Sequence, residues 1–269
     1  MNNYNVSSTY IMEPFNENER LDKKVDQAEY VQKYLNHFMS PTDKILDVGR
    51  MSAVIDEYIA LSNPNIHITG IDISANRLIE TYYQRKRLPN LIFVSANVYD
   101  LPFVDNSFDM VFSRFVFQYI KYPLKALSEI KRVCRPKGYI VIQDIDGQLF
   151  LHYPKDEVLL LLDKIFIDIN KYIKLDPFIG RKLFHLLYQT EFQKIQVKLE
   201  PYHLIAGKAK ETDYKYWKEK FQIIQTYLSS YTQFNSAEMN KTASSYLDYL
   251  QKEDTISFSN LFTVYGQKK

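Results

Sequence analysis

Two aspartates and a glycine stand where short apolar runs end, a pattern typical of a nucleotide-binding site. Asp47 and Gly49 close the run KILDVG at 44–49, and Asp72 closes a second run 25 positions after Asp47. A glycine there lets a ligand approach the backbone, and an aspartate at the end of the next strand can accept hydrogen bonds from ribose hydroxyls. The alternative is structural: Asp47 orders its loop, and Asp72 caps a helix that begins near Ser74.

The elements that must position these residues follow from the spacing of apolar side chains. Short apolar runs predict strands, and the segments between them show the three-to-four spacing of amphipathic helices. Strands are predicted at 45–48, 66–71, 91–95, 108–112 and 139–143, and helices at 17–39, 54–61, 76–87 and 122–134. This alternation predicts an α/β fold with a doubly wound, mostly parallel sheet and helices on both faces. Ligands of such sheets bind beyond the carboxyl ends of the strands.

The pattern changes after Gly147, where helical spacing predominates. Helices are predicted at 158–173, 179–190, 212–231 and 236–251, and strands at 192–199 and 256–265. We expect these helices to form a cap over the ligand crevice. The predicted organisation is an N-terminal helical segment or lid at 1–40, a cofactor-binding core at 41–150, and cap helices with the last strands at 151–269.

Composition narrows the classes of partner. The 34 basic and 32 acidic residues are interspersed and give a formal net charge of +2, which argues against a nucleic-acid partner. No apolar run approaches the roughly 20 residues that span a bilayer, and the first residues lack the order of a signal peptide, so we expect no membrane partner and a cytoplasmic location. The single cysteine, Cys134, excludes a Cys-cluster metal site and reads as a buried structural thiol. No metal site is predicted.

Four segments together resemble the class I S-adenosylmethionine-dependent methyltransferases of the small-molecule branch. They read KILDVG at 44–49, ITGIDIS at 68–74, NVYDLPFVDNSFDMVFSRFVFQYI at 97–120 and EIKRVCRPKGYIVIQDID at 129–146. The resemblance implies a Rossmann-like sheet of seven strands with a helical cap, S-adenosyl-L-methionine as cofactor and a small-molecule acceptor. It leaves the acceptor atom and the oligomeric state open.

The resemblance also implies roles for residues at the strand ends. It places Asp72 at the ribose, Ile73 against the adenine, and Asn97 and Val98 at the adenine edge. Asn97 stands where the family has an acidic residue. Beyond the fourth strand it places residues beside the reactive sulfonium and residues that face the substrate. The implied cofactor contacts are Asp47, Gly49, Arg50, Asp72, Ile73, Asn97, Val98, Ser113 and Arg114, and the implied substrate contacts are Gln118 and Tyr119.

The loop after Gly49 departs from the family, which has glycine at the positions of Met51 and Ala53. A residue with a Cβ that is forced into a left-handed conformation costs on the order of 1–3 kcal/mol, and Arg50 and Met51 add long side chains beside the cofactor path. Three readings follow: an adapted loop that still binds the cofactor, a loop that binds something else, or an inactive fold retained for binding or assembly. The main hypothesis is a methyltransferase. The alternative is a catalytically degenerate relative that acts as a binding or scaffold partner, or that uses the site for other chemistry.

Methyl transfer needs a base only when the acceptor must first lose a proton. The candidates for that catalytic role are His152, Asp144 and Asp146, because 143–147 ends the fifth predicted strand and leads toward the crevice mouth. Asp146 before Gly147 is also typical of a turn, and His152 also fits a surface or core imidazole. His185 and His203 rank lower.

Overall fold

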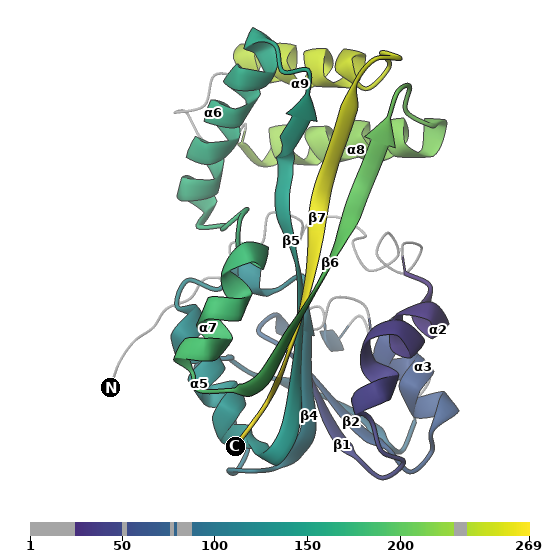
Figure 1. Ribbon diagram of the computed structural model, residues 1–269, viewed down its shortest axis with the longest axis vertical. Coiled ribbons are helices and arrows are strands. Elements are labelled where there is room, and N and C mark those ends of the chain that lie inside the picture. Colours follow the sequence, from purple (N-terminus) through teal and green to yellow (C-terminus); the bar gives the residue numbers. More distant parts are fainter. Residues whose placement is uncertain (1–24, 50–52, 76–77, 80–87, 229–235) are drawn as a thin grey trace.

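The computed structural model describes residues 25–49, 53–75, 78–79, 88–228 and 236–269. Within them one sheet has the strand order β3-β2-β1-β4-β5-β7-β6 (Figure 1). The strands are β1 Lys44–Val48, β2 His67–Asp72, β3 Leu91–Ser95, β4 Phe108–Arg114, β5 Cys134–Tyr153, β6 Gln193–Ala206 and β7 Ile256–Gln267. Strands β1 to β5 pair in parallel, and β7 is antiparallel to both of its neighbours. The predicted mostly parallel, seven-stranded sheet is confirmed.

Helices cover both faces of this sheet. Helices α5 and α7 lie on one face, and α2 and α3 lie on the other (Figure 1). The bounds are α2 Gln27–Tyr30, η1 Val31–Leu35, η2 Asn36–Phe38, α3 Val54–Ser62, η3 Phe117–Tyr119, α5 Pro123–Val133, α6 Glu157–Ile173, η4 Gly180–Lys182, α7 Leu183–Gln189, α8 Glu211–Leu228 and α9 Ser236–Tyr249.

Successive side chains of β1 enter different cores. Ile45 packs with the cluster under α2 and α3, and Leu46 packs with the cluster under α5 and α7. A strand between two layers of helices must be apolar on both sides, which explains why KILDVG shows no alternation. The predicted helix 76–87 lies mostly outside the described residues, as do positions 17–24 of the first predicted helix.

The prediction for the fifth strand was too short. Strand β5 is 20 residues long and runs from Cys134 past its predicted end at 143 to Tyr153. It pairs with β7 from Tyr139 to Tyr153, except between Asp146 and Leu151. Gly147 lies in this irregularity at φ +74. A glycine within a strand often marks a bulge, so the residue that reads as the end of the strand is a kink in its middle.

The extended halves of β5, β6 and β7 carry the cap. Helices α6, α8 and α9 pack around them as a second layer (Figure 1). This layer has its own apolar core, in which Trp217 is 2 % exposed and Tyr246 is fully buried. Three of the four helices expected in the cap are therefore there, and they stand on strands that are continuous with the main sheet. The prediction was wrong for the helix at 179–190, because its apolar residues, as α7, pack against the main sheet beside α5 (Figure 1).

In the part of the chain that the structure describes, no helix combines the length and the apolar character needed to cross a membrane.

Candidate active site at the carboxyl edge of the sheet

Gly49 ends β1 at the centre of the sheet, where the strand order reverses between β2 and β4. Its φ is +78, a left-handed value that glycine adopts without a Cβ penalty. Its amide donates to the carbonyl of Ile71 at 3.0 Å, which joins the ends of β1 and β2. A Cβ at this position would overlap the side chain of Val116. That side chain therefore packs against the Gly49 backbone more closely than any other residue type would allow.

Ala53 keeps the conformation expected of a glycine in this loop. It precedes α3 at φ 58 and ψ 6 and is buried. Arg50 and Met51 lie outside the described residues, so the roles expected for them stay predictions. The left-handed backbone at Ala53 favours a loop that has adapted to a new side chain while keeping its path.

Replacing Ala53 with glycine should stabilise the protein by about 1 kcal/mol, because an L-residue in this region is strained by roughly that amount. Urea unfolding of Ala53→Gly measures the gain. The matched control is Ala60→Gly, in the right-handed interior of α3, which should lose about 1 kcal/mol or more. A lower free energy of unfolding for Ala53→Gly than for the unaltered protein would show that the backbone at Ala53 is not strained.

Asp47 and Arg114 extend from neighbouring strands toward the face that α2 and α3 cover. Each stands two positions after a residue of that core, Ile45 and Phe112 respectively. The Arg114 Nε donates to Gln143 Oε1 at 3.0 Å, and its guanidinium lies 4.1 Å from the centroid of the Phe115 ring. The two strands thus place a carboxylate and a guanidinium on the same face of the sheet, where the methionine part of the cofactor was expected.

Tyr30 of α2 joins this pair and was missed by the sequence argument. Its ring lies 5.2 Å from the Arg114 guanidinium, and burial raises the pKa of its hydroxyl. That hydroxyl is buried and has no hydrogen-bond partner among the described residues. An orphaned buried hydroxyl costs about 1–3 kcal/mol unless a ligand or water completes it. Tyrosine carries a hydroxyl and was counted as a polar residue in the helical pattern. Its large aromatic ring was the feature that could have indicated burial.

Asp72 ends β2, and Ile73 follows it at the same edge of the sheet. The Ser74 amide donates to Asp72 Oδ1 at 2.8 Å, which closes a turn directly after β2; the helix that Asp72 was expected to cap lies mostly outside the described residues. Ile73 is 43 % exposed, which suits an apolar surface for a planar base.

Asn97 lies beyond β3 in a tight turn. Its Oδ1 accepts the Tyr99 amide at 3.0 Å, so the carbonyl expected to read the adenine amino group already holds its own loop. Val98 is partly buried and packs against the core under α5. The predicted adenine contacts of both residues stay predictions.

Ser113 is buried, and its hydroxyl donates to the Val48 carbonyl at 2.9 Å. This bond fastens the end of β4 to the end of β1. The predicted contact of Ser113 with the sulfonium is untested, and the structural role is the one that the geometry shows.

Gln118 and Asp144, expected as a substrate contact and a base, bind each other. The Gln118 amide donates to Asp144 Oδ2 at 3.1 Å, and its side-chain Nε2 donates to Asp144 Oδ1 at 3.0 Å. The Ile145 amide also donates to Oδ1. Burial raises the pKa of Asp144 to about 7. Asp144 therefore clamps the segment after β4, which carries Val116 over Gly49 and also contains Tyr119.

Asp146, a further candidate for the base, forms an ion pair with Arg181. Its carboxylate is fully buried and accepts from the Arg181 amide at 2.9 Å and from Nη2 at 2.6 Å. The pair ties β5 to the start of α7. The prediction of a turn at Asp146 was wrong, because β5 continues through it.

His152, another of the candidates for the base, lies in the cap and apart from Asp144. Eight positions of strand separate them, roughly 26 Å at 3.3 Å per residue and less across the bulge. The His152 Nδ1 lies 3.0 Å from Ser257 Oγ, and the ring packs edge-on against Tyr246. Burial lowers the pKa of His152 to about 4. The core-imidazole alternative is what the structure shows.

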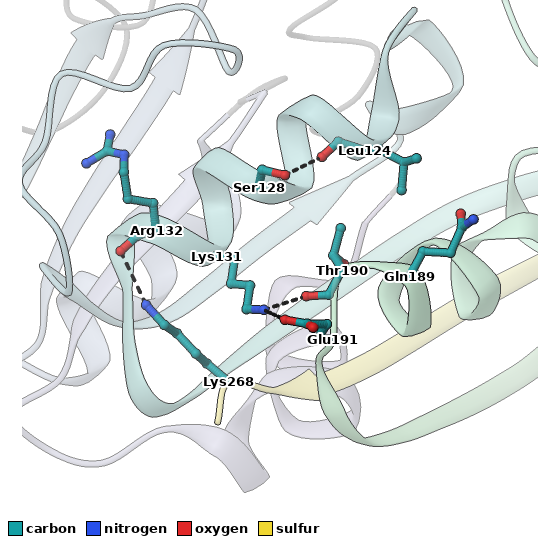
Figure 2. A pocket seen from close by; sticks show the side chains of 8 residues that line it. All are labelled: Leu124, Ser128, Lys131, Arg132, Gln189, Thr190, Glu191 and Lys268. Carbon is teal, nitrogen blue, oxygen red and sulfur yellow. Dashed lines mark hydrogen bonds and ion pairs between the residues drawn. The ribbon is translucent and has the colours of Figure 1, made fainter.

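A wide polar recess lies at the opposite edge of the sheet, between the C-terminal ends of α5 and α7 (Figure 2). The lysine and arginine side chains that line this recess donate hydrogen bonds to backbone carbonyls. Lys131 Nζ donates to Thr190 O at 2.7 Å and pairs with Glu191 at 3.1 Å. The recess is thus explained by helix termination.

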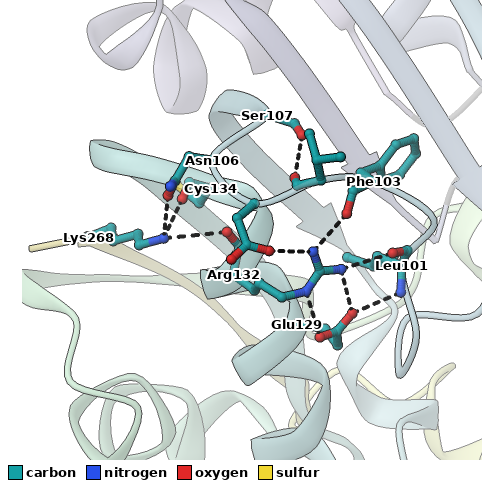
Figure 3. A network of polar contacts seen from close by, with 10 residues as sticks. Leu101, Phe103, Asn106, Ser107, Glu129, Arg132, Cys134 and Lys268 are labelled. Carbon is teal, nitrogen blue, oxygen red and sulfur yellow. Dashed lines mark hydrogen bonds and ion pairs between the residues drawn. The ribbon is translucent and has the colours of Figure 1, made fainter.

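Arg132, from the last of the four resembling segments, has a structural role. Its guanidinium donates to the carbonyls of Phe103 at 2.7 Å and Leu101 at 2.9 Å, and pairs with Glu129 at 2.8 Å (Figure 3). The network fixes the loop between β3 and β4. Cys134 beside it is fully buried, and burial raises the pKa of its thiol to about 12, in accord with a structural thiol.

Among the described residues, no group of three or more His, Cys, Asp or Glu side chains is placed to hold a metal ion.

Comparison with known proteins agrees with this architecture. Residues 46–142 match the methyltransferase domain family. An O-methyltransferase of Aspergillus nomiae is 34 % identical over 160 residues, which cover 57 % of this chain and 65 % of the relative. A demethylmenaquinone methyltransferase of Renibacterium salmoninarum is 30 % identical over 110 residues, which cover 41 % and 44 %. The chain spans about half the length of the first curated relatives that it matches.

A solved structure supports the fold. Phosphoethanolamine N-methyltransferase 2 of Haemonchus contortus, in complex with phosphomonomethylethanolamine and S-adenosylhomocysteine, superposes with a TM-score of 0.57 at 19 % identity, over 98 % of this chain and 60 % of that one. At this identity the likeness concerns the fold alone. Residues 46–142 are thus similar to the methyltransferase domain family, and the sheet order agrees with the Rossmann-like methyltransferase fold.

Proposed function

We propose that this protein transfers the methyl group of S-adenosylmethionine to a small-molecule acceptor. The observation that carries the proposal is the left-handed Gly49 beside Asp72 at the centre of the carboxyl edge. A doubly wound sheet binds its ligand at this point, because the crossovers diverge there and leave the strand ends uncovered.

The residues present fit the cofactor. The orphaned Tyr30 hydroxyl lies near the charges of Asp47 and Arg114, where an ammonium and a carboxylate would find partners. Asp72 would hold the ribose, and Ile73 would lie against the adenine.

When bound, the sulfonium supplies an already activated methyl group, so the protein mainly has to align the acceptor and exclude water. The clamp between Asp144 and Gln118 serves that purpose, since it fixes the segment after β4 over Gly49. The names of the relatives support an oxygen or carbon nucleophile, because one is an O-methyltransferase and another acts on demethylmenaquinone. The test is formation of S-adenosylhomocysteine from S-adenosylmethionine with a panel of phenols and quinols.

Asp72→Ala should weaken S-adenosylmethionine binding roughly 10- to 100-fold, because hydrogen bonds from ribose hydroxyls to a carboxylate contribute about 1.5–3 kcal/mol. Titration calorimetry measures the change. The variant also loses the hydrogen bond from the Ser74 amide, so Asp156→Ala is the matched control: Asp156 accepts the Leu159 amide at 3.0 Å at the start of α6. Equal affinities for Asp72→Ala and the control would remove Asp72 from the site.

A further inference from the structure

The helical segment that carries Tyr30 changes its winding directly after this residue. Helix α2 ends at Tyr30, and η1 follows as a π-helical turn, closed by a hydrogen bond from the Asn36 amide to the Val31 carbonyl. Such turns are rare and occur frequently at functional sites. Tyr30 is buried, and the centroid of its ring lies 5.2 Å from Cζ of Arg114. The change of winding therefore lies next to the residue that this segment brings to the carboxyl edge of the sheet.

Glu200, on the edge strand β6, binds the π-helical turn with both of its carboxylate oxygens. Tyr34 Oη donates to Glu200 Oε2 at 2.6 Å, and Lys33 Nζ pairs with Glu200 Oε1 at 2.6 Å. Although partial burial opposes it, the hydrogen bonds from Lys33 and Tyr34 hold the pKa of Glu200 below its ordinary value. Hydrogen bonds to an ionised acceptor are stronger than those between neutral groups. Glu200 thus fastens the turn to the sheet.

The contact continues from Tyr34 to Tyr30. The centroids of the two rings lie 5.1 Å apart, and the ring planes are tilted by 48°. The ammonium groups of Lys33 and Lys198 lie 5.3 Å and 4.9 Å from the centroid of the Tyr34 ring, and cations at such distances are attracted to an aromatic face. The Tyr34 ring is therefore held at its hydroxyl and beside its face, and Tyr30 packs against it.

Glu200 is remote from Arg114. Strand β6 is the third strand after β4 in the sheet order, which separates the two strands by roughly 14 Å. Through Leu261 of β7, Glu200 is level with Ile145 of β5. Arg114 is level with Gln143, two positions earlier in β5. The helical segment that begins with α2 lies over this face of the sheet and connects the two residues (Figure 1).

We propose that Glu200 is a positioning residue of the proposed cofactor site: by holding Tyr34, it keeps Tyr30 beside Arg114. The inference rests on the proposed function for the identity of the ligand. Glu200 itself neither contacts the cofactor nor takes part in methyl transfer. Its effect on the site passes through the two tyrosine rings.

Hydrogen exchange of the backbone amides at 30–36 tests this hold without any ligand. We expect these amides to exchange about tenfold faster in Glu200→Ala and in Tyr34→Phe, which keeps the ring but lacks the donor. Asp163→Ala is the matched control, because Asp163 is likewise a carboxylate paired with a lysine, Lys155, but lies in the cap. It should leave exchange at 30–36 unaltered. Unchanged exchange in both Glu200→Ala and Tyr34→Phe would overturn the proposal.

The affinity for S-adenosylmethionine, measured by titration calorimetry, tests whether Glu200 acts through Tyr30. Tyr30→Phe and Glu200→Ala should each weaken binding about tenfold. The double variant should bind no more weakly than either single variant, because both changes remove the same contact with the cofactor. Independent losses that multiply to about 100-fold would overturn the proposal, since a residue that acts elsewhere in the structure would give additive free energies.

Failure of the proposed function would look different. If S-adenosylmethionine does not bind to the unaltered protein while exchange at 30–36 depends on Glu200, the cofactor is wrong and Glu200 still positions Tyr30. If S-adenosylmethionine binds and the losses of the two variants multiply, the proposed function stands and the positioning role fails.

Discussion

Asp144→Asn is expected to remove the contribution of the Asp144 carboxyl to stability that is lost between pH 4 and pH 7, about 4 kcal/mol. Burial raises the pKa of Asp144 to about 7 from an unfolded value near 3.8, against the opposing hydrogen bonds from the Ile145 and Gln118 amides. The folded state therefore holds a proton that the unfolded state has released. Its contribution to stability is complete below pH 3.8 and is lost as the pH rises through 7, at about 1.36 kcal/mol per pH unit.

Urea unfolding at a series of pH values measures this effect as the difference between variant and unaltered protein. Asparagine keeps one acceptor of the clamp and loses the other, so the variant carries a constant cost of about 1–3 kcal/mol as well. The prediction concerns the slope of the difference with pH. Asp163→Asn, in the cap, is the control for removing a carboxylate elsewhere. Parallel curves for Asp144→Asn and the unaltered protein would show that Asp144 titrates normally.

His152→Asn should have the opposite slope. Burial lowers the pKa of His152 to about 4 from 6.5. Between these two pH values the imidazole is protonated in the unfolded state and neutral in the folded state. The stability that His152 contributes is present above pH 6.5 and is lost as the pH falls through 4, by about 3 kcal/mol in all. The asparagine amide can still bond to Ser257, which keeps the packing with Tyr246.

The measurement is again urea unfolding, between pH 4 and pH 6.5. The acid-induced loss should be smaller in His152→Asn by about 3 kcal/mol. The exposed His67 provides the control variant, His67→Asn, whose curve should follow that of the unaltered protein. If His152→Asn loses as much stability in acid as the unaltered protein, His152 is not buried as a neutral ring. Because the slopes of Asp144 and His152 oppose each other, each effect is read from the difference between variant and unaltered protein.

The parallel half of the sheet could be predicted from the sequence because its strands are short apolar runs between amphipathic helices. Strands β1, β2 and β3 lie within one residue of their predicted bounds. Strand β7 was predicted at 256–265, two residues short of its end, whereas the full lengths of β5 and β6 could not be predicted, because their bulges interrupt the alternation that identifies a strand. Gly147 and His203 each stand at such an interruption, and both adopt positive φ.

The site was predictable where backbone position decides the role. Gly49 and Asp72 are at the strand ends that were expected of them. Side-chain pairing was not predictable, because it depends on which loops meet. Asp144 was expected as a base and holds Gln118, and Asp146 holds Arg181. Tyr30 was missed because its contacts come from other elements.

The account depends on the carboxyl edge around Gly49 and Asp72 being a binding site for S-adenosylmethionine. Titration calorimetry of the unaltered protein with S-adenosylmethionine and S-adenosylhomocysteine tests this without knowledge of the acceptor. We expect one site per chain with micromolar affinity for both. Absence of binding, with binding restored in the double variant Met51→Gly, Ala53→Gly, would show that the loop has abandoned the cofactor and would contradict the account.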